Sequence, residues 1–324
     1  MQVRRRQFLI AAGVLLAAPL ARAQTAPRRM AWFGAGRAGT PSPFLDAMRA
    51  GLRELGWEEG RNLALTPFWT EGTPEEAERL ARQMLESNPE IIVVYGRDVL
   101  TVQRLKPAGP VVFGFSGNPV DAGVVQSFAR PGGSFTGMSF MSLERVGKRV
   151  ELLREIVPRI RRLAVLARPE HAGEHRERAA SEDVARKLGL EVAYVPIQAA
   201  SGLDGALQAV VQQHCDALVA FPDAVMLAHS GRIATFAEQR KIATVSGWGG
   251  FADNGFLLTF GPNLYDSYRR LAAYVDRILR GARPDQLPVE LPRTVELVLN
   301  PRTARALGLT IPQSILLRAD RVIE

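Results

Sequence analysis

Short runs of β-branched and aromatic residues alternate with amphipathic stretches along most of this 324-residue chain, and this alternation constrains its fold more than any other feature. The first strands are predicted at Met30–Phe33, Leu63–Trp69, Glu90–Tyr95 and Pro110–Phe115. Helices are predicted between them, over Phe44–Leu55, Pro74–Ser87 and Val99–Leu105. Strands that alternate with helices form parallel sheets, and the Ile-Ile-Val-Val run at residues 91–94 is typical of a strand buried on both faces. The sequence therefore predicts an α/β fold with doubly wound parallel sheets.

The alternation stops around Arg130–Gly133 and begins again after Met138. In the second series, strands are predicted at Arg162–Ala167, Leu190–Pro196, Ala217–Phe221 and Ala243–Ser246. The helices of this series are predicted over Leu143–Val157, Glu174–Leu188, Leu203–Gln213 and Val225–Gln239. A closing segment adds a strand at Phe256–Phe260, a long helix at Leu264–Arg280, a Pro-rich crossing at Pro284–Pro292, a strand at Val295–Leu299 and a short helix near Arg302–Leu307. This restart predicts two similar lobes.

The first 23 residues have the order of parts of a signal peptide: Arg4–Arg6, an apolar run over Phe8–Leu20, and the small-residue triplet Ala21-Arg22-Ala23. The run is shorter than the roughly 20 residues of a spanning helix. Residues 5–9, Arg-Arg-Gln-Phe-Leu, match the twin-arginine export signal in part, so both this route and the general secretory route stay open. Cleavage near Ala23 would release a periplasmic protein that is not embedded in the membrane.

The basic surplus of the chain is concentrated in this leader. The formal net charge is +8, and removal of four arginines and no acidic residue with the leader lowers it to +4. The remaining cations are interleaved with acids, which is typical of solvated helix faces, so no nucleic-acid partner is expected. Cys215 is the single cysteine, which excludes an intrachain disulfide and a cysteine-based zinc site.

Gly34, Gly36 and Gly39 form a GxGxxG sequence directly after the first predicted strand, where a dinucleotide-binding loop would lie. In that motif the last glycine enters a helix, but Thr40-Pro41-Ser42-Pro43 intervenes here. An exported NAD(P)-dependent oxidoreductase is therefore kept as the enzyme alternative, and a ligand-facing loop is the favoured interpretation. No cofactor is expected.

Two further motifs carry catalytic alternatives. His171 to His175 match the HxxEH pattern of inverted zinc peptidases, but Pro169 and Gly173 favour a loop that leads into a helix, and no third ligand stands out. Ser116 lies in Gly-Phe-Ser-Gly-Asn, which lacks the closing glycine of a nucleophile elbow. Neither a metal site nor a catalytic residue is expected.

Several longer segments resemble one family, the periplasmic substrate-binding proteins of ABC importers that include tryptophan- and other aromatic-amino-acid-binding members. The segments that carry this resemblance are Gly51–Asn62, Asn118–Val120, Ala129–Gly137, Lys148–Leu153, Tyr268–Gly281, Leu287–Glu290, Ala304–Pro312 and Arg318–Glu324. The resemblance covers essentially the whole chain after the leader.

The resemblance implies a clamshell of two lobes joined by three hinge strands, with crossings near Met138, Asn254 and Leu287. Lobe one would comprise residues 24–138 and 255–286, and lobe two residues 139–254 and 287–324. It further implies a monomeric, non-catalytic protein that closes on a small ligand and delivers it to a membrane permease with its ATPase. A binding protein that serves a sensor kinase is an alternative that the sequence does not separate from this one.

Ligands of parallel α/β sheets bind beyond the carboxyl ends of the strands, so the predicted ligand site lies there. The expected ligand-binding residues are Gly36, Arg37, Tyr95, Arg97, Ser116, Asn118, Phe140, Arg168, Phe221, Asp223 and Trp248. The arginines or Ser116 would bind a carboxylate, Asp223 an ammonium group, and Tyr95, Phe140 or Trp248 an aromatic ring. The alternative for each ring is a place in the core of its lobe.

The chain departs from the family pattern at positions that bear on the ligand. Family members commonly have Asp where Asn118 stands, Asn at Ser134 and Tyr at Phe260, so one carboxylate near the pocket is absent here. The expected ligand is an amino acid, or an aromatic or carboxylated compound.

Overall fold

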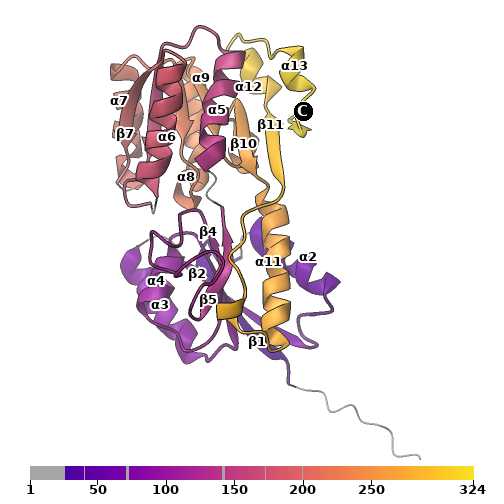
Figure 1. The fold of residues 1–324 in the computed structure, drawn as a ribbon. Coiled ribbons are helices and arrows are strands. Elements are labelled where there is room, and N and C mark those ends of the chain that lie inside the picture. Colours follow the sequence, from indigo (N-terminus) through magenta and orange to yellow (C-terminus); the bar gives the residue numbers. More distant parts are fainter. Residues whose placement is uncertain (1–25, 40, 71–72, 141–142, 172, 199) are drawn as a thin grey trace, which may run out of the picture.

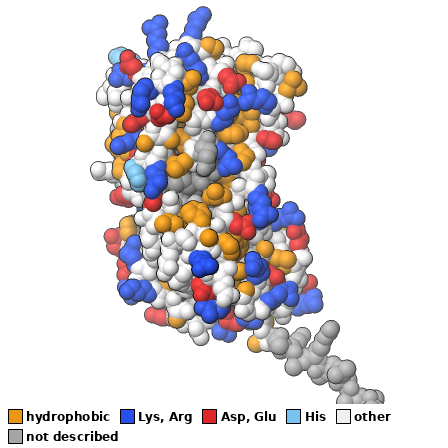
Figure 2. Space-filling view, viewed as in Figure 1, with side chains coloured by type: hydrophobic (Ala, Val, Ile, Leu, Met, Phe, Trp, Pro, Cys, Tyr) orange, Lys and Arg blue, Asp and Glu red, His pale blue; other side chains and the backbone are white. Residues whose placement is uncertain are grey.

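The computed structural model describes residues 26–39, 41–70, 73–140, 143–171, 173–198 and 200–324, and it has two lobes stacked end to end (Figure 1). The predicted signal peptide, residues 1–23, lies outside these ranges. Within them, no helix is long and apolar enough to cross a bilayer. Figure 2 shows Lys and Arg side chains interspersed with Asp and Glu over both lobes, as the interleaved charges of the sequence predict.

The first lobe is built on a parallel five-stranded sheet with the order β2-β1-β3-β4-β5. Its strands are β1 (Arg28–Ala35), β2 (Leu63–Thr70), β3 (Ile91–Tyr95), β4 (Val111–Phe115) and β5 (Phe135–Ser139). Its helices are α2 (Pro43–Glu54), α3 (Pro74–Glu86), α4 (Asp98–Arg104) and α11 (Leu264–Leu279). The last of these comes from the closing segment of the chain and runs from the waist of the molecule along the lower lobe (Figure 1).

Alternation along β1 explains how helices cover both faces of this sheet. Met30 and Trp32 pack in a core with α2 and α11, whereas Ala31 and Phe33 pack in a separate core with α3 and α4. Every residue of β3 is buried, as predicted for a strand covered on both faces. The helices begin where the sequence supplies capping groups: the side chain of Ser42 accepts from the Leu45 N–H, with a proline at the first position of α2.

The second lobe has a seven-stranded sheet with the order β12-β11-β10-β9-β8-β6-β7. Its strands are β6 (Arg162–Ala167), β7 (Glu191–Pro196), β8 (Ala217–Ala220), β9 (Ala243–Ser246), β10 (Leu258–Pro262), β11 (Val295–Leu299) and β12 (Arg321–Val322). Its helices are α5 (Leu143–Ile156), α6 (Glu174–Lys187), α7 (Leu203–Gln212), α8 (Ala224–Ala228), α9 (Ser230–Gln239), α10 (Gly249–Asp253), α12 (Pro301–Ala306) and α13 (Gln313–Leu316). All neighbouring strands are parallel except β10 and β11, which are antiparallel. The predicted helix over 225–239 is interrupted at His229, which separates α8 from α9.

Sheet membership differs from the predicted lobe boundaries at two of the three crossings. Leu258 pairs with Val245 and with Leu299, so β10 belongs to the second sheet and the chain crosses after Pro262, not near Asn254. Residues 287–290 stay with the first lobe: the Val289 N–H donates to the Phe128 carbonyl (2.7 Å), and the Glu290 N–H donates to the Gly137 carbonyl (3.0 Å). The third crossing therefore lies between Glu290 and β11.

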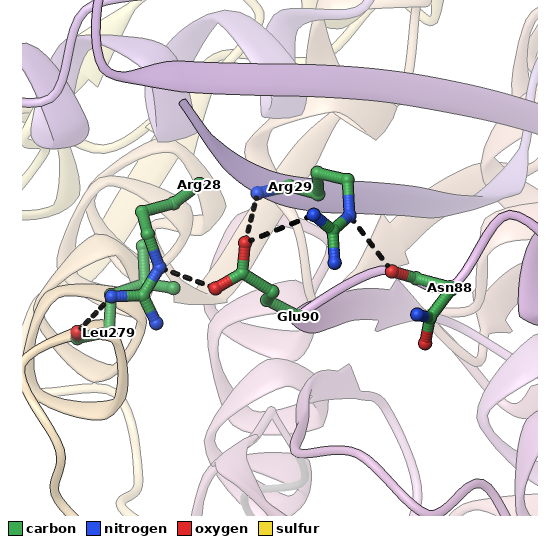
Figure 3. Close-up of polar contacts among 5 residues, drawn as sticks. All are labelled: Arg28, Arg29, Asn88, Glu90 and Leu279. Atoms are coloured by element: carbon green, nitrogen blue, oxygen red, sulfur yellow. Dashed lines mark hydrogen bonds and ion pairs between the residues drawn. The ribbon is translucent and has the colours of Figure 1, made fainter. Parts of the chain in front are cut away.

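At the end of lobe one far from the waist, Glu90 joins the start of β1 to the end of α11 (Figure 3). Its carboxylate accepts from Arg28 Nε (2.5 Å) and from the Arg29 backbone N–H (3.1 Å). Arg28 also donates to the Leu279 carbonyl, and Arg29 to the Asn88 carbonyl. Burial raises the pKa of Glu90, but the hydrogen bonds and charges of Arg29 and Arg28 outweigh it, so the pKa lies below the ordinary value. Polar contacts thus anchor the outer edge of the lobe.

Candidate functional site

Strand ends from both lobes meet in a set of neighbouring cavities at the junction. The largest has a volume of about 770 Å³, within the range of small-molecule sites. Lobe one contributes residues that end or follow its strands, Ala35, Thr70 and Arg97. Lobe two contributes Arg168, Gln198 and Ala224, which follow β6, β7 and β8. The carboxyl edges of the two sheets therefore form opposite walls of one cleft, as expected for ligand sites of parallel α/β sheets.

Three of the predicted arginines, Arg37, Arg97 and Arg168, line this same cavity. Arg168 is 8% exposed and lies 3.5 Å from Asp223 Oδ2 and 3.6 Å from Glu170 Oε2. Arg97 lines all three neighbouring cavities and makes no side-chain hydrogen bond or ion pair with any described residue. The fold therefore brings together positively charged side chains that lie more than a hundred residues apart in the sequence.

A hydrogen bond crosses the cleft between Ser116 Oγ, after β4, and His171 Nε2, after β6, at 2.7 Å. Both residues line a cavity of about 250 Å³, and Asp223 lines the same cavity. Burial lowers the pKa of His171, although the nearby Asp223 charge acts in the opposite direction. His171 is thus a cleft residue that sequence reasoning considered only as a zinc ligand. Its motif partner His175 is exposed, and no metal-binding cluster of His, Cys, Asp or Glu occurs among the described residues.

Asp223, the predicted acceptor for a ligand ammonium group, has contacts for both of its carboxylate oxygens. Oδ1 accepts from the Met226 N–H (2.7 Å) and so caps α8, and Oδ2 faces Arg168. The side chain is buried at the cleft wall. In this structure Asp223 therefore caps the start of α8 and holds Arg168 in position.

The predicted aromatic residues at the junction pack against other aromatic rings of the protein. Tyr95, Phe140 and Trp248 border a space of only about 10 Å³. Tyr268, which the sequence reasoning did not select, lies at the centre of this group, with ring centroids 6.0 Å from Tyr95, 5.4 Å from Phe140 and 4.7 Å from Phe44. Trp248 Nε1 is buried and has no hydrogen-bond partner among the described residues. Of this aromatic group, Tyr95 also lines one of the three neighbouring cavities, whereas Phe140, Trp248 and Tyr268 border only the small space.

Two predicted site residues lie away from the described cavities. Phe221, which directly follows β8, is 4% exposed and packs in the core of lobe two. Asn118 Oδ1 accepts from the N–H groups of Val120 (2.9 Å) and Asp121 (3.3 Å), so the side chain stabilises a turn. Neither is among the residues that line the cavities given above.

The glycines after β1 have packing reasons of their own. A Cβ on Gly34 would lie 2.3 Å from the Tyr95 ring, and one on Gly36 would lie 2.5 Å from the Trp69 ring. The Tyr95 hydroxyl donates to the Ala35 carbonyl between them. Close approach of two aromatic rings to the backbone thus accounts for the glycines at 34 and 36, and Gly36 lines the largest cavity.

A buried ion pair lies behind the lobe-two loops that form the cleft wall. Arg149 is 1% exposed, and its Nε donates to the Phe260 carbonyl (2.9 Å). Its Nη1 lies 3.9 Å from Glu177 Oε1. A Cβ on Gly247 would lie 2.5 Å from Arg149 Nη2, which places the guanidinium against the loop after β9. Burial raises the pKa of Glu177 to about 7, although Arg149 acts in the opposite direction. In the sequence Arg149 is one of many helix-surface charges, so nothing marks it as buried.

Comparisons with known proteins agree with this architecture. Residues 43–323 match the family described as ABC transporter substrate binding protein. The chain is similar to a tyrosine-binding protein of Clostridioides difficile (strain R20291), with 22% identity over 275 residues that cover 82% of this chain and 78% of the relative.

Two solved structures have a closely similar fold. One is an ABC domain from Streptococcus pneumonia in complex with L-Trp, with a TM-score of 0.84, 19% identity, and coverage of 92% of this chain and 100% of the other. The other is a conserved domain protein from Vibrio cholerae, with a TM-score of 0.83, 27% identity, and coverage of 91% and 99%. They confirm the predicted two-lobed α/β fold. The match over residues 43–323 likewise confirms the resemblance drawn from the sequence: the chain belongs to the ABC transporter substrate-binding protein family.

Proposed function

We propose that this protein captures a small organic ligand between its two lobes and delivers it, by hinge closure, to the permease and ATPase of an ABC importer. The observation that carries the proposal is the cavity of about 770 Å³ whose walls are the strand ends of both lobes. A ligand there touches both lobes at once, so it stabilises the closed arrangement over an open one. The role is binding without catalysis.

The ligand that we propose is an amino acid, or an aromatic or carboxylated compound. Arg97 and Arg168 supply donors for a carboxylate, and the Tyr95 ring lines a smaller neighbouring cavity together with Arg97. The relative is named for tyrosine, and one similar structure was solved with L-Trp, which supports this class of ligand.

Contacts between the lobes support closure as the mechanism. Besides the Ser116–His171 hydrogen bond, Arg176 of α6 lies 2.6 Å from Asp121, which follows β4. Both contacts start from the chain that follows β4 in lobe one; one reaches the loop before α6 and the other reaches the first turn of α6 in lobe two. They can form only while the lobes are together, so they add to whatever the ligand contributes to the closed arrangement.

The sequence of the leader supports export to the periplasm, by the twin-arginine or the general secretory route, with cleavage near Ala23. We propose that the released protein acts as a monomer there. Delivery requires that the protein lie in the same compartment as the outer face of the permease.

Differential scanning fluorimetry of the purified mature protein tests the binding role. A library of amino acids, aromatic acids and other organic acids should contain at least one compound that raises the melting temperature in a concentration-dependent way. A silent library would contradict the proposal. Uptake of that compound by a strain lacking the gene tests delivery: loss of uptake supports an importer, and unchanged uptake with loss of a transcriptional response would assign the protein to a sensor kinase instead.

A further inference from the structure

We propose that the cleft is built for an organic carboxylate that carries no ammonium group, in preference to a zwitterionic amino acid. This inference rests on the proposed function, because it concerns the ligand of the same site. It follows from the charge at the cavity, from the state of Arg97 and from the acceptors that the cavity lacks.

The charge that lines the largest cavity is positive. Three guanidinium groups line it, those of Arg37, Arg97 and Arg168, and the only described carboxylate among its lining residues is that of Glu170. Glu170 is a rim group, since its side chain is 69% exposed. Arg168 already lies 3.5 Å from Asp223, so Arg97 is the cation that an anionic ligand would meet, whereas a zwitterion adds no net charge.

Arg97 is the cation best placed to meet an anion. It follows β3 directly, lines each of the three neighbouring cavities and is half-buried. Its neighbour Asp98 does not neutralise it by contact: Asp98 is 2% exposed, and its Oδ2 accepts from the Thr70 hydroxyl at 2.7 Å. The Asp98 charge acts on Arg97 through space, but the Arg97 guanidinium makes no hydrogen bond or ion pair with any described residue. Such a half-buried guanidinium is a donor for a ligand carboxylate, which it can bind through two parallel hydrogen bonds.

An ammonium group needs acceptors, and the buried carboxylates of the cleft, Asp98 and Asp223, already have contacts within the protein. An alkyl ammonium has three N–H donors and no acceptor. Both oxygens of Asp223 have contacts within the protein, with the Met226 N–H and with Arg168. The Ser116 hydroxyl is bonded to His171, and Asp98 to Thr70. Among the described lining residues of the largest cavity this leaves two exposed acceptors, the carboxylate of Glu170 and the neutral amide oxygen of Gln198. Glu170 shares Arg168 with Asp223 and is screened by water.

The walls of the cavity indicate the chemical nature of the rest of the ligand. Ala35, Pro74, Ala224, Val225 and Ala228 supply apolar surface around the arginines. A volume of about 770 Å³ accommodates a small carboxylic acid with an aliphatic or aryl chain. The apolar walls lower the local dielectric and so strengthen the contact between Arg97 and a carboxylate.

Isothermal titration calorimetry on matched pairs tests this inference. The probes are L-tyrosine against 3-(4-hydroxyphenyl)propionate and L-glutamate against glutarate, each pair differing only in the amino group. In at least one pair we expect the acid without the amino group to bind about tenfold or more tightly, a difference of about 1.4 kcal/mol or more. Tighter binding of the amino acid in either pair would overturn the inference and leave the proposed function standing. Absence of binding by all four probes would contradict the inference, while the library screen decides the proposed function separately.

Variants assign the carboxylate contact to Arg97. Arg97→Ala should weaken binding of the preferred acid by about tenfold or more, and Arg97→Lys should weaken it less, because the charge is kept while the forked geometry is lost. Arg82→Ala removes an exposed guanidinium of α3 that pairs with Glu78, and it should leave the affinity unchanged. The melting temperature of the ligand-free variants shows whether they fold. Unchanged affinity in folded Arg97→Ala or Arg97→Lys would overturn the assignment.

Discussion

Ser116 Oγ in lobe one lies 2.7 Å from His171 Nε2 in lobe two, although the two residues are 55 positions apart and on opposite sheets. Each follows the carboxyl end of a strand, β4 or β6, so the hydrogen bond joins the two sides of the cleft. Desolvation at the junction of the lobes favours the neutral imidazole, because burial lowers the pKa of His171. Closure of the two lobes is thereby linked to the protonation state of His171.

The pH dependence of stability should carry a contribution from His171. Its pKa is lowered from 6.5 in the folded protein, so below about pH 6.5 the unfolded chain binds a proton that the folded chain does not yet bind. The free energy of unfolding therefore falls as the pH drops through the window between 6.5 and the lower folded value. Urea denaturation between pH 7.5 and 5 should show a shallower fall for His171→Gln than for the wild type. His175→Gln, an exposed change four residues away, is the control and should reproduce the wild-type curve.

Glu177 contributes to the same pH range with the opposite sign, so only the difference between wild type and variant is informative for His171. Its pKa is raised by burial to about 7, so the folded chain holds a proton that the unfolded carboxylate releases above about pH 4.5. The free energy of unfolding therefore rises as the pH falls from 7 towards 4.5. Glu177→Gln should remove this rise while His171→Gln preserves it. Identical curves for the two variants would contradict the assignment.

The ion pair between Arg176 and Asp121 should favour the closed arrangement of the lobes. Its atoms lie 2.6 Å apart, and the two side chains are 46% and 25% exposed. Partly exposed pairs contribute about 0.2–1 kcal/mol, so Arg176→Ala should weaken ligand binding by a factor of about 1.5–5. Arg186→Ala on the same helix removes an ion pair within α6, with Asp183, and should leave the affinity unchanged. Equal effects of the two variants in calorimetry would show that the interlobe pair does not assist closure.

Arg149 and Glu177 should behave as a coupled pair. Above about pH 7, where Glu177 is ionised in the folded protein, removal of one partner leaves the other charge buried, which costs about 3–5 kcal/mol in comparable sites. Arg149→Ala and Glu177→Ala should therefore each lower the free energy of unfolding strongly, and the double variant should lose less than their sum. Guanidinium denaturation of the four proteins gives the coupling energy, for which about 0.5–3 kcal/mol is expected. Simple additivity would show that the 3.9 Å approach carries no interaction.

Gly51 should be intolerant of a side chain, because α2 crosses α11 there. A Cβ at this position would lie 2.2 Å from the Arg269 carbonyl oxygen. Gly51→Ala should lower the free energy of unfolding by about 1–3 kcal/mol as the helices are forced apart. Gly205→Ala is the matched control: Gly205 lies inside α7 with no neighbouring atom within 4 Å of the Cβ, and the change should stabilise the protein by about 0.5–1 kcal/mol. Chemical denaturation of both variants checks the opposite signs.

The periodicity of the sequence is enough to predict the sheets but not the edges of the lobes. Met30–Phe33 in β1 and every residue of β3 are apolar and buried, as expected for strands that helices cover on both faces. Here the local sequence pattern and the packing agree. The predicted crossing near Asn254 is displaced because β10 finds partners on both sides, Val245 and Leu299, and strand pairing over such distances has no local signal. The proline-rich segment was expected to cross at Leu287, yet Val289 and Glu290 still bond to lobe one.

At the site, the sequence predicts which residue types lie at the strand ends but not how their side chains are oriented. Following the strand ends locates Arg37, Arg97 and Arg168 at one cavity, since the fold brings carboxyl edges together. It does not tell a ligand-facing Asp or Asn from one that caps its own backbone, as Asp223 and Asn118 do. Nor does it reveal Tyr268, which comes from α11 and lies at the centre of the aromatic group.

Small-angle X-ray scattering during a ligand titration tests the central claim, capture by closure of two lobes. The ligand is the compound with the largest thermal shift in the library, and the mature protein is measured from ligand-free to saturating concentration. The radius of gyration should fall with a midpoint that matches the calorimetric affinity, and Arg176→Ala should shift that midpoint to higher concentration. Saturated binding with an unchanged radius of gyration would contradict closure as the mechanism of this protein.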